Sequence, residues 1–434
     1  MITQEDYKRQ KKLEIDCLSS FTGKPYSLNT FSPDEVFAVK EEIKIELQKQ
    51  AIDTLLPWGE TNCSPFLDFE FHDHHFRYTY QREDLHAEPQ TLFSKTYNFP
   101  LPKEVDTAGF YTNCGMSAIS GTLFTIASIF PNTYHLYCDE DTYFETRLLI
   151  KHHIPSLLQA GSNGTGPYLY IVDTSAVPDI DSWTPKIEAS KNGDLSIVII
   201  DTTCYPLQSH KIQNFVEIAL QKNVLVVLVR SHEKLDFMAM EYSRLGSANF
   251  IYNNTLPDPT KRKISTLIEG FKQTMALLGL NFSLTSIPPF LTNKEFHEIN
   301  ATRIQRSAQN NLEIAIKLNA EITGKTPFSV KRSAHNLFFC INFNNFFSDK
   351  KLFALEDNLV KILSKNNIPT REVASFAFDF IAIIDFALPN EDKLLRFSIP
   401  DFPSENIAKC VSIIASAVIE ASRDPNSPLL VKHK

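Results

Sequence analysis

Short, fully apolar runs alternate with amphipathic stretches through the middle of the chain. Residues 197–200 and 224–229 contain no polar side chain, and residues 211–221 between them place apolar side chains at helical spacing. A strand that is apolar at every position buries both of its faces, which is typical of parallel strands packed between helices. The pattern over residues 108–290 therefore predicts an α/β domain with a mostly parallel sheet covered by helices.

The pattern changes after this region. Residues 264–278 and 294–322 read as two long helices, and shorter strands with two further helices follow as far as residue 421. This change predicts a smaller C-terminal α+β domain, and residues 61–100, rich in aromatic, His and Pro residues, read as extended arm and loop. The expected parts are an N-terminal helix and arm (1–107), a large domain (108–290), a connecting helix (291–325) and the small domain (326–434).

Composition narrows the class of protein. The net charge is −8 and the basic residues are scattered, so a nucleic-acid surface is not expected. No apolar run is long enough to cross a bilayer, and the first residues lack the pattern of a signal peptide. The seven cysteines form no CxxC pair, which favours reduced thiols. We therefore expect a cytoplasmic protein without membrane or nucleic-acid partners.

Charged residues follow two of the predicted strands. Asp201 comes directly after residues 197–200, and Lys234 lies shortly after residues 224–229. Sheets of this kind bind ligands beyond the carboxyl ends of their strands. There, a lysine can form a Schiff base with pyridoxal phosphate (PLP), and a carboxylate can keep the pyridine nitrogen protonated. Taken alone, Asp201 could equally be a cap at a strand end and Lys234 a surface lysine.

Two further features lie between predicted strands and helices. Residues 113–118 contain Gly115 at an expected helix N-terminus, where backbone N–H groups bind phosphate well. Tyr143 begins the next unit, where an aromatic ring could stack on a flat cofactor. The alternatives are an ordinary strand–helix turn and a core tyrosine.

The order of these motifs resembles the fold-type I PLP-dependent enzymes of the aspartate aminotransferase superfamily. It is most similar to the branch for Cys/Met metabolism, which contains cystathionine γ-synthase, cystathionine β-lyase and methionine γ-lyase. Residues 114–120 look like the phosphate loop Ser-Gly-Met-Ala-Ala-Ile. The other similar stretches are Tyr143 with Thr146 (Tyr-Gly-Gly-Thr), Asp201-Thr202-Thr203 (Asp-Asn-Thr), Ser231-His232-Glu233-Lys234 (Ser-Ala-Thr-Lys) and Tyr80-Gln81-Arg82 (Tyr-Ser-Arg).

The resemblance implies a role for each matching residue. Lys234, Asp201 and Tyr143 would be catalytic. PLP would be held by Gly115, Met116, Ser117, Tyr143, Asp201, Thr203, Ser231 and Lys234, with Tyr80 and Arg82 reaching the phosphate of a neighbouring subunit. Arg396 and Ser375 would bind the substrate α-carboxylate, the arginine through its bidentate guanidinium. Because of the arm that acts between subunits, we expect a homodimer or homotetramer, with an amino acid as the small-molecule substrate.

Several positions depart from the family pattern. Phe144 and Glu145 replace two glycines, and Asp173-Thr174-Ser175 stands where the branch has Asn-Pro. After the lysine, residues 236–239 replace Gly-His-Ser-Asp, whereas residues 241–246 with Arg244 are more like an aminotransferase. The branch implies β- or γ-elimination or replacement. Aminotransfer is the alternative, and a PLP-binding scaffold or regulator without catalysis is a third hypothesis.

A group of histidines offers a competing site. His72-Asp73-His74-His75 carries donors that suit a metal. In an extended chain, however, successive side chains point to opposite faces, which would separate these donors. We therefore expect a polar arm or interface here, with a metal or substrate site as the alternative.

Overall fold

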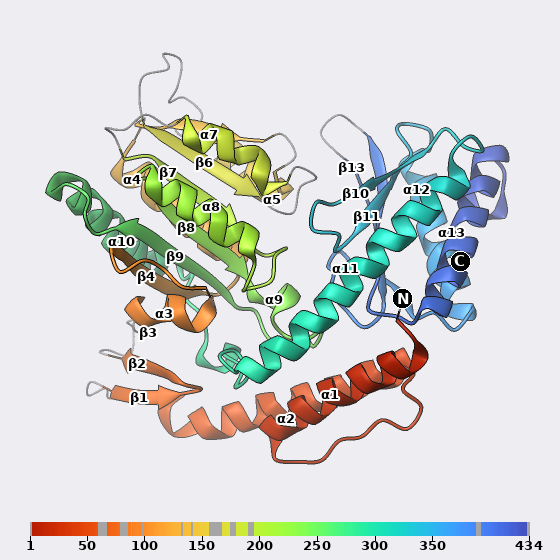
Figure 1. Ribbon diagram of the computed structural model, residues 1–434, viewed down its shortest axis with the longest axis horizontal. Helices are drawn as coiled ribbons and strands as arrows, with labels where there is room; N and C mark the ends of the chain where they lie inside the picture. Colours follow the sequence, from red (N-terminus) through yellow and green to blue (C-terminus); the bar gives the residue numbers. More distant parts are fainter. Residues whose placement is uncertain are drawn as a thin grey trace. The chain divides into compact units, whose positions relative to one another are not determined.

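The computed structural model describes residues 2–59, 67–78, 86–87, 89–97, 99–131, 133–139, 142–155, 167–173, 179–189, 195–387 and 392–431 (Figure 1). The chain forms two compact units. The larger unit comprises Gln48–Phe237 and Glu241–Asn293, and the smaller unit comprises Met1–Leu47, Met238–Met240 and Lys294–Lys434. The four-part division expected from the sequence remains a prediction.

A six-stranded sheet forms the centre of the larger unit, with the strand order β4-β9-β8-β7-β6-β5 (Figure 1). Strands β5 to β8 run parallel, and β9 is antiparallel to both of its neighbours. The predicted mostly parallel sheet is therefore confirmed. Its strands are β4 (Val105–Thr112), β5 (His135–Cys138), β6 (Tyr168–Asp173), β7 (Ile197–Asp201), β8 (Leu225–Ser231) and β9 (Gly246–Asn253).

Alternate side chains of one strand explain why the sheet is covered on both faces. Ile197 and Ile199 of β7 belong to one buried cluster, and Val198 and Ile200 belong to another. The first cluster is shared with α4 (Gly115–Ile129), α5 (Phe144–His153) and α10 (Asp258–Leu278). The second is shared with α3 (Pro89–Thr96), η1 (Ile180–Trp183), α7 (Thr184–Glu188) and α8 (His210–Gln221).

The expected extended arm over residues 61–100 is partly wrong. Strands β1 (Leu67–Phe71) and β2 (His74–Tyr78) pair as an antiparallel hairpin, the short β3 (His86–Ala87) adds to it, and helix α3 follows. The two turn residues His72 and Asp73 have φ values of 47° and 59°, as a tight two-residue hairpin turn requires. Asn and Gly usually fill such turns, so His-Asp gave no turn signal.

His74 of this hairpin is a buried structural residue. Its Nδ1–H donates to the carbonyl oxygen of His72 over 2.7 Å, and its Nε2 accepts from the hydroxyl of Tyr111 at 2.8 Å. Burial lowers the pKa of His74 to about 4, so the ring stays neutral at pH 7. Within the described ranges, no group of three or more His, Cys, Asp or Glu side chains is arranged to hold a metal ion.

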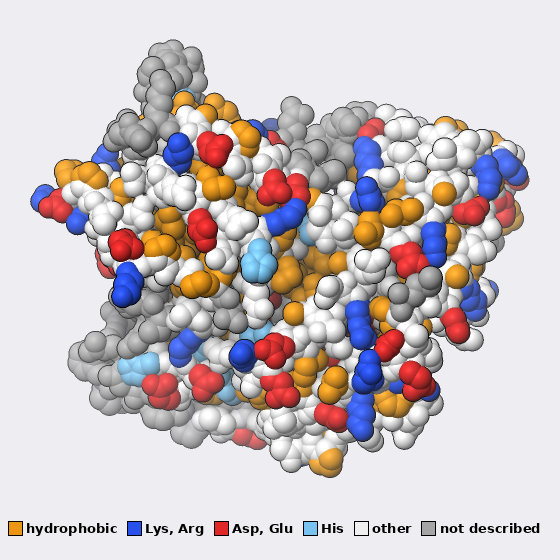
Figure 2. Space-filling view, viewed as in Figure 1, with side chains coloured by type: hydrophobic (Ala, Val, Ile, Leu, Met, Phe, Trp, Pro, Cys, Tyr) orange, Lys and Arg blue, Asp and Glu red, His pale blue; other side chains and the backbone are white. Residues whose placement is uncertain are grey.

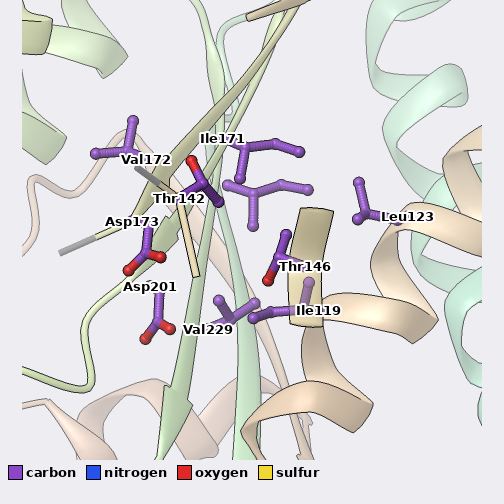
Figure 3. A pocket seen from close by; sticks show the side chains of 10 residues that line it. Ile119, Leu123, Thr142, Thr146, Ile171, Val172, Asp173, Asp201 and Val229 are labelled. Atoms are coloured by element: carbon purple, nitrogen blue, oxygen red, sulfur yellow. The ribbon is translucent and has the colours of Figure 1, made fainter. Parts of the chain in front are cut away.

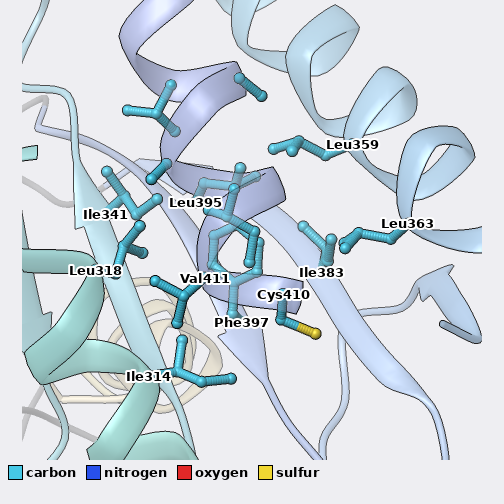
Figure 4. Packing of buried hydrophobic residues seen from close by; sticks show 14 of the residues in the cluster. Ile314, Leu318, Ile341, Leu359, Leu363, Ile383, Leu395, Phe397, Cys410 and Val411 are labelled. Carbon is cyan, nitrogen blue, oxygen red and sulfur yellow. The ribbon is translucent and has the colours of Figure 1, made fainter. Parts of the chain in front are cut away.

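The smaller unit contains a five-stranded sheet with the order β10-β11-β14-β13-β12. Aromatic and aliphatic side chains pack between this sheet and its helices (Figure 4), and the rings of Phe339 and Phe397 stack with centroids 5.2 Å apart. This is the expected α+β arrangement. Its elements are β10 (Ser329–Arg332), β11 (Phe339–Asn342), β12 (Thr370–Glu372), β13 (Ile381–Ala387), β14 (Lys393–Ser398), α11 (Lys294–Ile322), α12 (Asp349–Lys365) and α13 (Ser404–Arg423).

Six charged side chains lie buried together in the smaller unit, and we call them the buried ion cluster. Its members are Lys11, Glu14, Lys40, Arg303, Asp379 and Asp401. Lys11 Nζ lies 2.7 Å from Asp379 and 2.8 Å from Asp401, while Lys40 Nζ lies 2.7 Å from both Glu14 and Asp379. The cluster fastens α1 (Gln4–Thr22) and the start of α2 (Pro33–Gly59) to the C-terminal part of the chain.

Charges on the surface are mixed. On the face shown in Figure 2, lysine and arginine side chains are interspersed with acidic ones. None of the described helices has the length and apolar character needed to cross a membrane.

Candidate active site

Two aspartates lie side by side at the carboxyl edge of the larger sheet. Asp173 ends β6 and Asp201 ends β7, and the two residues are paired in the parallel register (Figure 3). The backbone N–H of Thr203 donates to Asp201 Oδ1 over 2.9 Å. Burial, and then the negative charge of Asp173, raise the pKa of Asp201 to about 6. This edge therefore favours a bound cation or a proton.

Tyr143 lies next to this pair of carboxylates. Its backbone N–H donates to Asp173 Oδ2, which fixes the residue immediately before α5. Tyr143 is 37% exposed, and its ring packs edge-to-face with that of Phe144, with ring centroids 4.9 Å apart. A partly exposed tyrosine whose backbone is anchored to Asp173 could stack on a flat ligand at this edge.

The expected phosphate-binding residues also come together. Gly115 begins α4, and a Cβ atom on it would lie only 2.9 Å from Ser231 Cβ. The backbone N–H of Ser231 donates to Thr203 Oγ1 over 2.9 Å. The side chains of the next two residues of α4 make other contacts. Ser117 is buried against Cys114, and Met116 Sδ lies 3.9 Å from Thr146 Oγ1. A helix N-terminus beside two hydroxyl side chains suits an anion.

Lys234 lies on a one-turn helix just after β8, α9 (His232–Leu235), with its side chain half-buried. The buried groups near it in the chain were not predicted from the sequence. Arg230 and His232 both bond to Asp236, and none of the three is more than 3% exposed. A signal was available, because Arg230 directly follows the apolar run of β8 and a charged residue there needs a partner.

The remaining predicted residues lie elsewhere. Arg396 and Ser375 belong to the smaller unit, where the arginine Nη2 donates to the Ser375 carbonyl oxygen over 3.3 Å. The guanidinium also lies 5.3 Å from the centre of the Phe338 ring. Tyr80 and Arg82 lie outside the described residues.

The residues of the larger unit fit PLP in type and position. A carboxylate with a raised pKa can pair with a pyridinium, a helix N-terminus with Ser231 and Thr203 can bind a phosphate, and Lys234 supplies a primary amine. A small cavity lined by the two aspartates, Thr146 and Ile119 measures about 10 Å³ (Figure 3). That volume holds about one water molecule, so this cavity is too small for a cofactor.

Replacing Asp173 by asparagine should lower the pKa of Asp201. In the wild-type protein the folded-state pKa of about 6 exceeds the ordinary value of 3.8, so the folded state binds more protons between these values and stability falls as pH rises through this window. Asp173→Asn keeps an acceptor for the Tyr143 N–H but removes the negative charge. The fall in stability with rising pH should therefore end at a lower pH in this variant. Urea unfolding of the cofactor-free protein from pH 4 to 7 measures this. Asp201→Asn is the control and should remove that part of the slope; equal slopes for Asp173→Asn and wild type would contradict the expectation.

Comparison with known proteins gives similarity only at the level of structure. No protein-family model and no curated protein sequence matches the chain. The cytoplasmic aspartate aminotransferase of Giardia lamblia is 11% identical, with 93% of this chain and 90% of that chain covered, at a TM-score of 0.52. An aromatic-amino-acid aminotransferase of Burkholderia pseudomallei, covalently bound to pyridoxal phosphate, is 13% identical (87% and 88% covered, TM-score 0.47).

A putative O-acetylhomoserine (thiol)-lyase of Campylobacter jejuni is 15% identical, with 72% of this chain and 81% of that chain covered and a TM-score of 0.43. At such identities a structural match shows a shared fold alone, and of these three structures only the Giardia enzyme exceeds a TM-score of 0.5. Its match agrees with the helix-covered, mostly parallel sheet and the α+β unit described above. The chain has the fold of the fold-type I PLP-dependent enzymes.

Proposed function

We propose that this protein is a PLP-dependent enzyme that acts on an amino acid and that Lys234 binds the cofactor covalently. The observation that carries the proposal is the meeting of Asp201, Ser231 and the N-terminus of α4 at one edge of the sheet, one helical turn from Lys234. When bound, PLP acts as an electron sink that stabilises negative charge at the substrate Cα.

Each residue has a distinct task in this proposal. Asp201 holds a positive charge at the ring nitrogen, and Tyr143 supports the flat ring. Gly115 binds the phosphate through its backbone N–H group, and Ser231 binds it through its hydroxyl. Lys234 would supply the amine that holds the cofactor and the base that takes the proton from the substrate Cα.

The smaller unit offers the group that would orient the substrate. Arg396 is half-buried, and its guanidinium donates to the Ser375 carbonyl oxygen; the planar fork of an arginine suits a carboxylate. We propose that it binds the α-carboxylate. The arm residues Tyr80 and Arg82 would complete the site of a second subunit, so we propose a homodimer or a larger assembly.

The proposed reaction is β- or γ-elimination or replacement, which the order of the sequence motifs favours. Aminotransfer is the second candidate, because residues 241–246 are more like an aminotransferase and because the Giardia enzyme with the same fold is an aspartate aminotransferase. The two reactions differ in their need for an acceptor. A lyase releases ammonia from one amino acid, whereas an aminotransferase requires a 2-oxo acid.

The test of the proposal is covalent trapping on the purified wild-type protein. We expect added PLP to give a yellow absorption band, and borohydride to fix the cofactor to the peptide containing Lys234 by mass spectrometry. Incubation with single amino acids, with and without a 2-oxo acid, then separates lyase from aminotransferase. Trapping with no Cα–H exchange for any amino acid would support a PLP-binding scaffold instead, and the absence of a band would refute the assignment of the cofactor.

A further inference from the structure

The side chain of Arg230 lies wholly inside the larger unit, at the end of β8. Its Nε and Nη2 donate to Oδ2 and Oδ1 of Asp236, both over 2.6 Å. This is the bidentate pairing that fixes an arginine and a carboxylate in one plane. Asp236 directly follows α9, so the ion pair closes the turn that carries Lys234.

The same guanidinium reaches the loop that follows Asp201. Its Nη1 donates to the carbonyl oxygen of Thr202 over 2.5 Å and to that of Tyr205 over 2.8 Å. Four hydrogen bonds from one planar group therefore join the Asp201 loop to the Lys234 turn. These are the two segments that carry the carboxylate and the amine of the candidate site.

His232 completes the arrangement from the other side of Asp236. The Arg230 guanidinium holds the pKa of Asp236 well below its usual range, so the carboxylate accepts from His232 Nδ1–H at 2.7 Å. His232 Nε2 then accepts from the hydroxyl of Ser247, at 3.0 Å. The order Ser-His-Asp resembles a hydrolytic triad, but Ser247 has no exposed surface. These contacts therefore hold the turn in place.

The turn needs such support, because α9 is only one turn long. A helix of this length fixes several backbone dihedral angles for very few hydrogen bonds. Its conformation must therefore come from tertiary contacts. Such contacts are made by Asp236 with Arg230 and with His232, and these residues lie on both sides of Lys234 in the chain.

From this geometry we propose that Arg230, with Asp236 and His232, is a positioning group that sets the Lys234 turn against the Asp201 loop. The inference rests on the proposed function of Lys234. The contacts of Arg230 described above involve neither the carboxylate of Asp201 nor the amine of Lys234. Arg230 is therefore not a catalytic residue. A merely structural Arg230 would affect only stability, whereas a positioning Arg230 also controls the reactivity of Lys234.

The test compares wild type with Arg230→Lys and the milder His232→Gln. A lysine keeps the charge, but its single ammonium cannot replace the planar fork. In the cofactor-free protein at a temperature well below unfolding, the acetylation rate of Lys234 by a limiting amine reagent is followed by peptide mass spectrometry. We expect this rate to change in both variants and the apparent affinity for PLP to fall by on the order of 10-fold to 100-fold for Arg230→Lys. A smaller fall in the same direction is expected for His232→Gln.

Arg303→Lys is the matched control. Arg303 is also buried, but it lies in the smaller unit and bonds to Asn300 and the Ala377 carbonyl oxygen. It should lower the melting temperature while leaving the acetylation rate of Lys234 at the wild-type value. Arg230 variants that lose stability with unchanged acetylation and PLP affinity would overturn the inference. Wild-type protein that never traps PLP at Lys234 would refute the proposed function instead, and the acetylation rates would still show whether Arg230 positions the lysine.

Discussion

Lys234→Ala is expected to abolish the covalent attachment of PLP and to leave the fold intact. Alanine has no amine with which to form the Schiff base, and it cannot take the Cα proton. Loss of a positioned general base alone slows a reaction by about 10²- to 10⁴-fold. The side chain is half-buried at the sheet edge, so its removal should change stability little. Absorption spectra before and after borohydride, together with turnover of a reactive amino acid, measure both losses.

Two controls make the Lys234 result specific. Lys234→Arg keeps the positive charge but cannot form the adduct, so it should behave like Lys234→Ala. Lys222→Ala removes a half-buried lysine at the end of α8 in the same unit and should bind and react like wild type. A trapped adduct that persists in Lys234→Ala would show that another lysine holds the cofactor.

Lys11→Met is expected to destabilise the smaller unit by about 3–5 kcal/mol, the usual cost of leaving buried charges unpaired. Lys11 Nζ contacts Glu14, Asp379 and Asp401, and all four groups are at most 1% exposed. In the wild-type cluster three cations balance three anions. Without the Lys11 ammonium, the Asp401 carboxyl loses this ion pair and stays buried, and burial already raises its pKa. Urea unfolding followed by circular dichroism measures the change.

The double variant Lys11→Met with Asp401→Asn tests the cause. It removes an anion together with its cation, so we expect it to recover part of the lost stability, as coupled neighbours do. Lys8→Met is the matched control, because Lys8 lies on the same helix but pairs with Glu5 at the surface, where ion pairs contribute little. A double variant no more stable than Lys11→Met would contradict the role given to the unpaired charge.

The site is a mixture of predictable and unpredictable parts. Asp201, Ser231 and Lys234 were predictable because residues at the carboxyl ends of parallel strands share one edge of the sheet. The neighbouring carboxylate of Asp173 was not predicted to face Asp201, since that contact depends on the register between β6 and β7. Similarly, Arg230 could be recognised as a charge in an apolar run, but not as a link between two loops.

The sequence alone determined the large features of the fold. Strands β6, β7 and β8 are apolar at nearly every position because both of their faces are buried. The residue types of each strand therefore predict its burial. The same pattern placed α8 and α11 close to their observed bounds. Strand β9 escaped notice because Ser247 and Asn249, both wholly buried, interrupt its apolar pattern.

Only the tertiary structure decided which charges meet. Lys11 pairs with Asp379 and Asp401 across 368 and 390 residues of sequence, and no local pattern records a contact of that range. A buried charge requires a partner, so the sequence can show that one must exist. Which residue fills that role depends on how α1 packs against the C-terminal part of the chain, because distance in space, and not spacing along the chain, sets the strength of an ion pair.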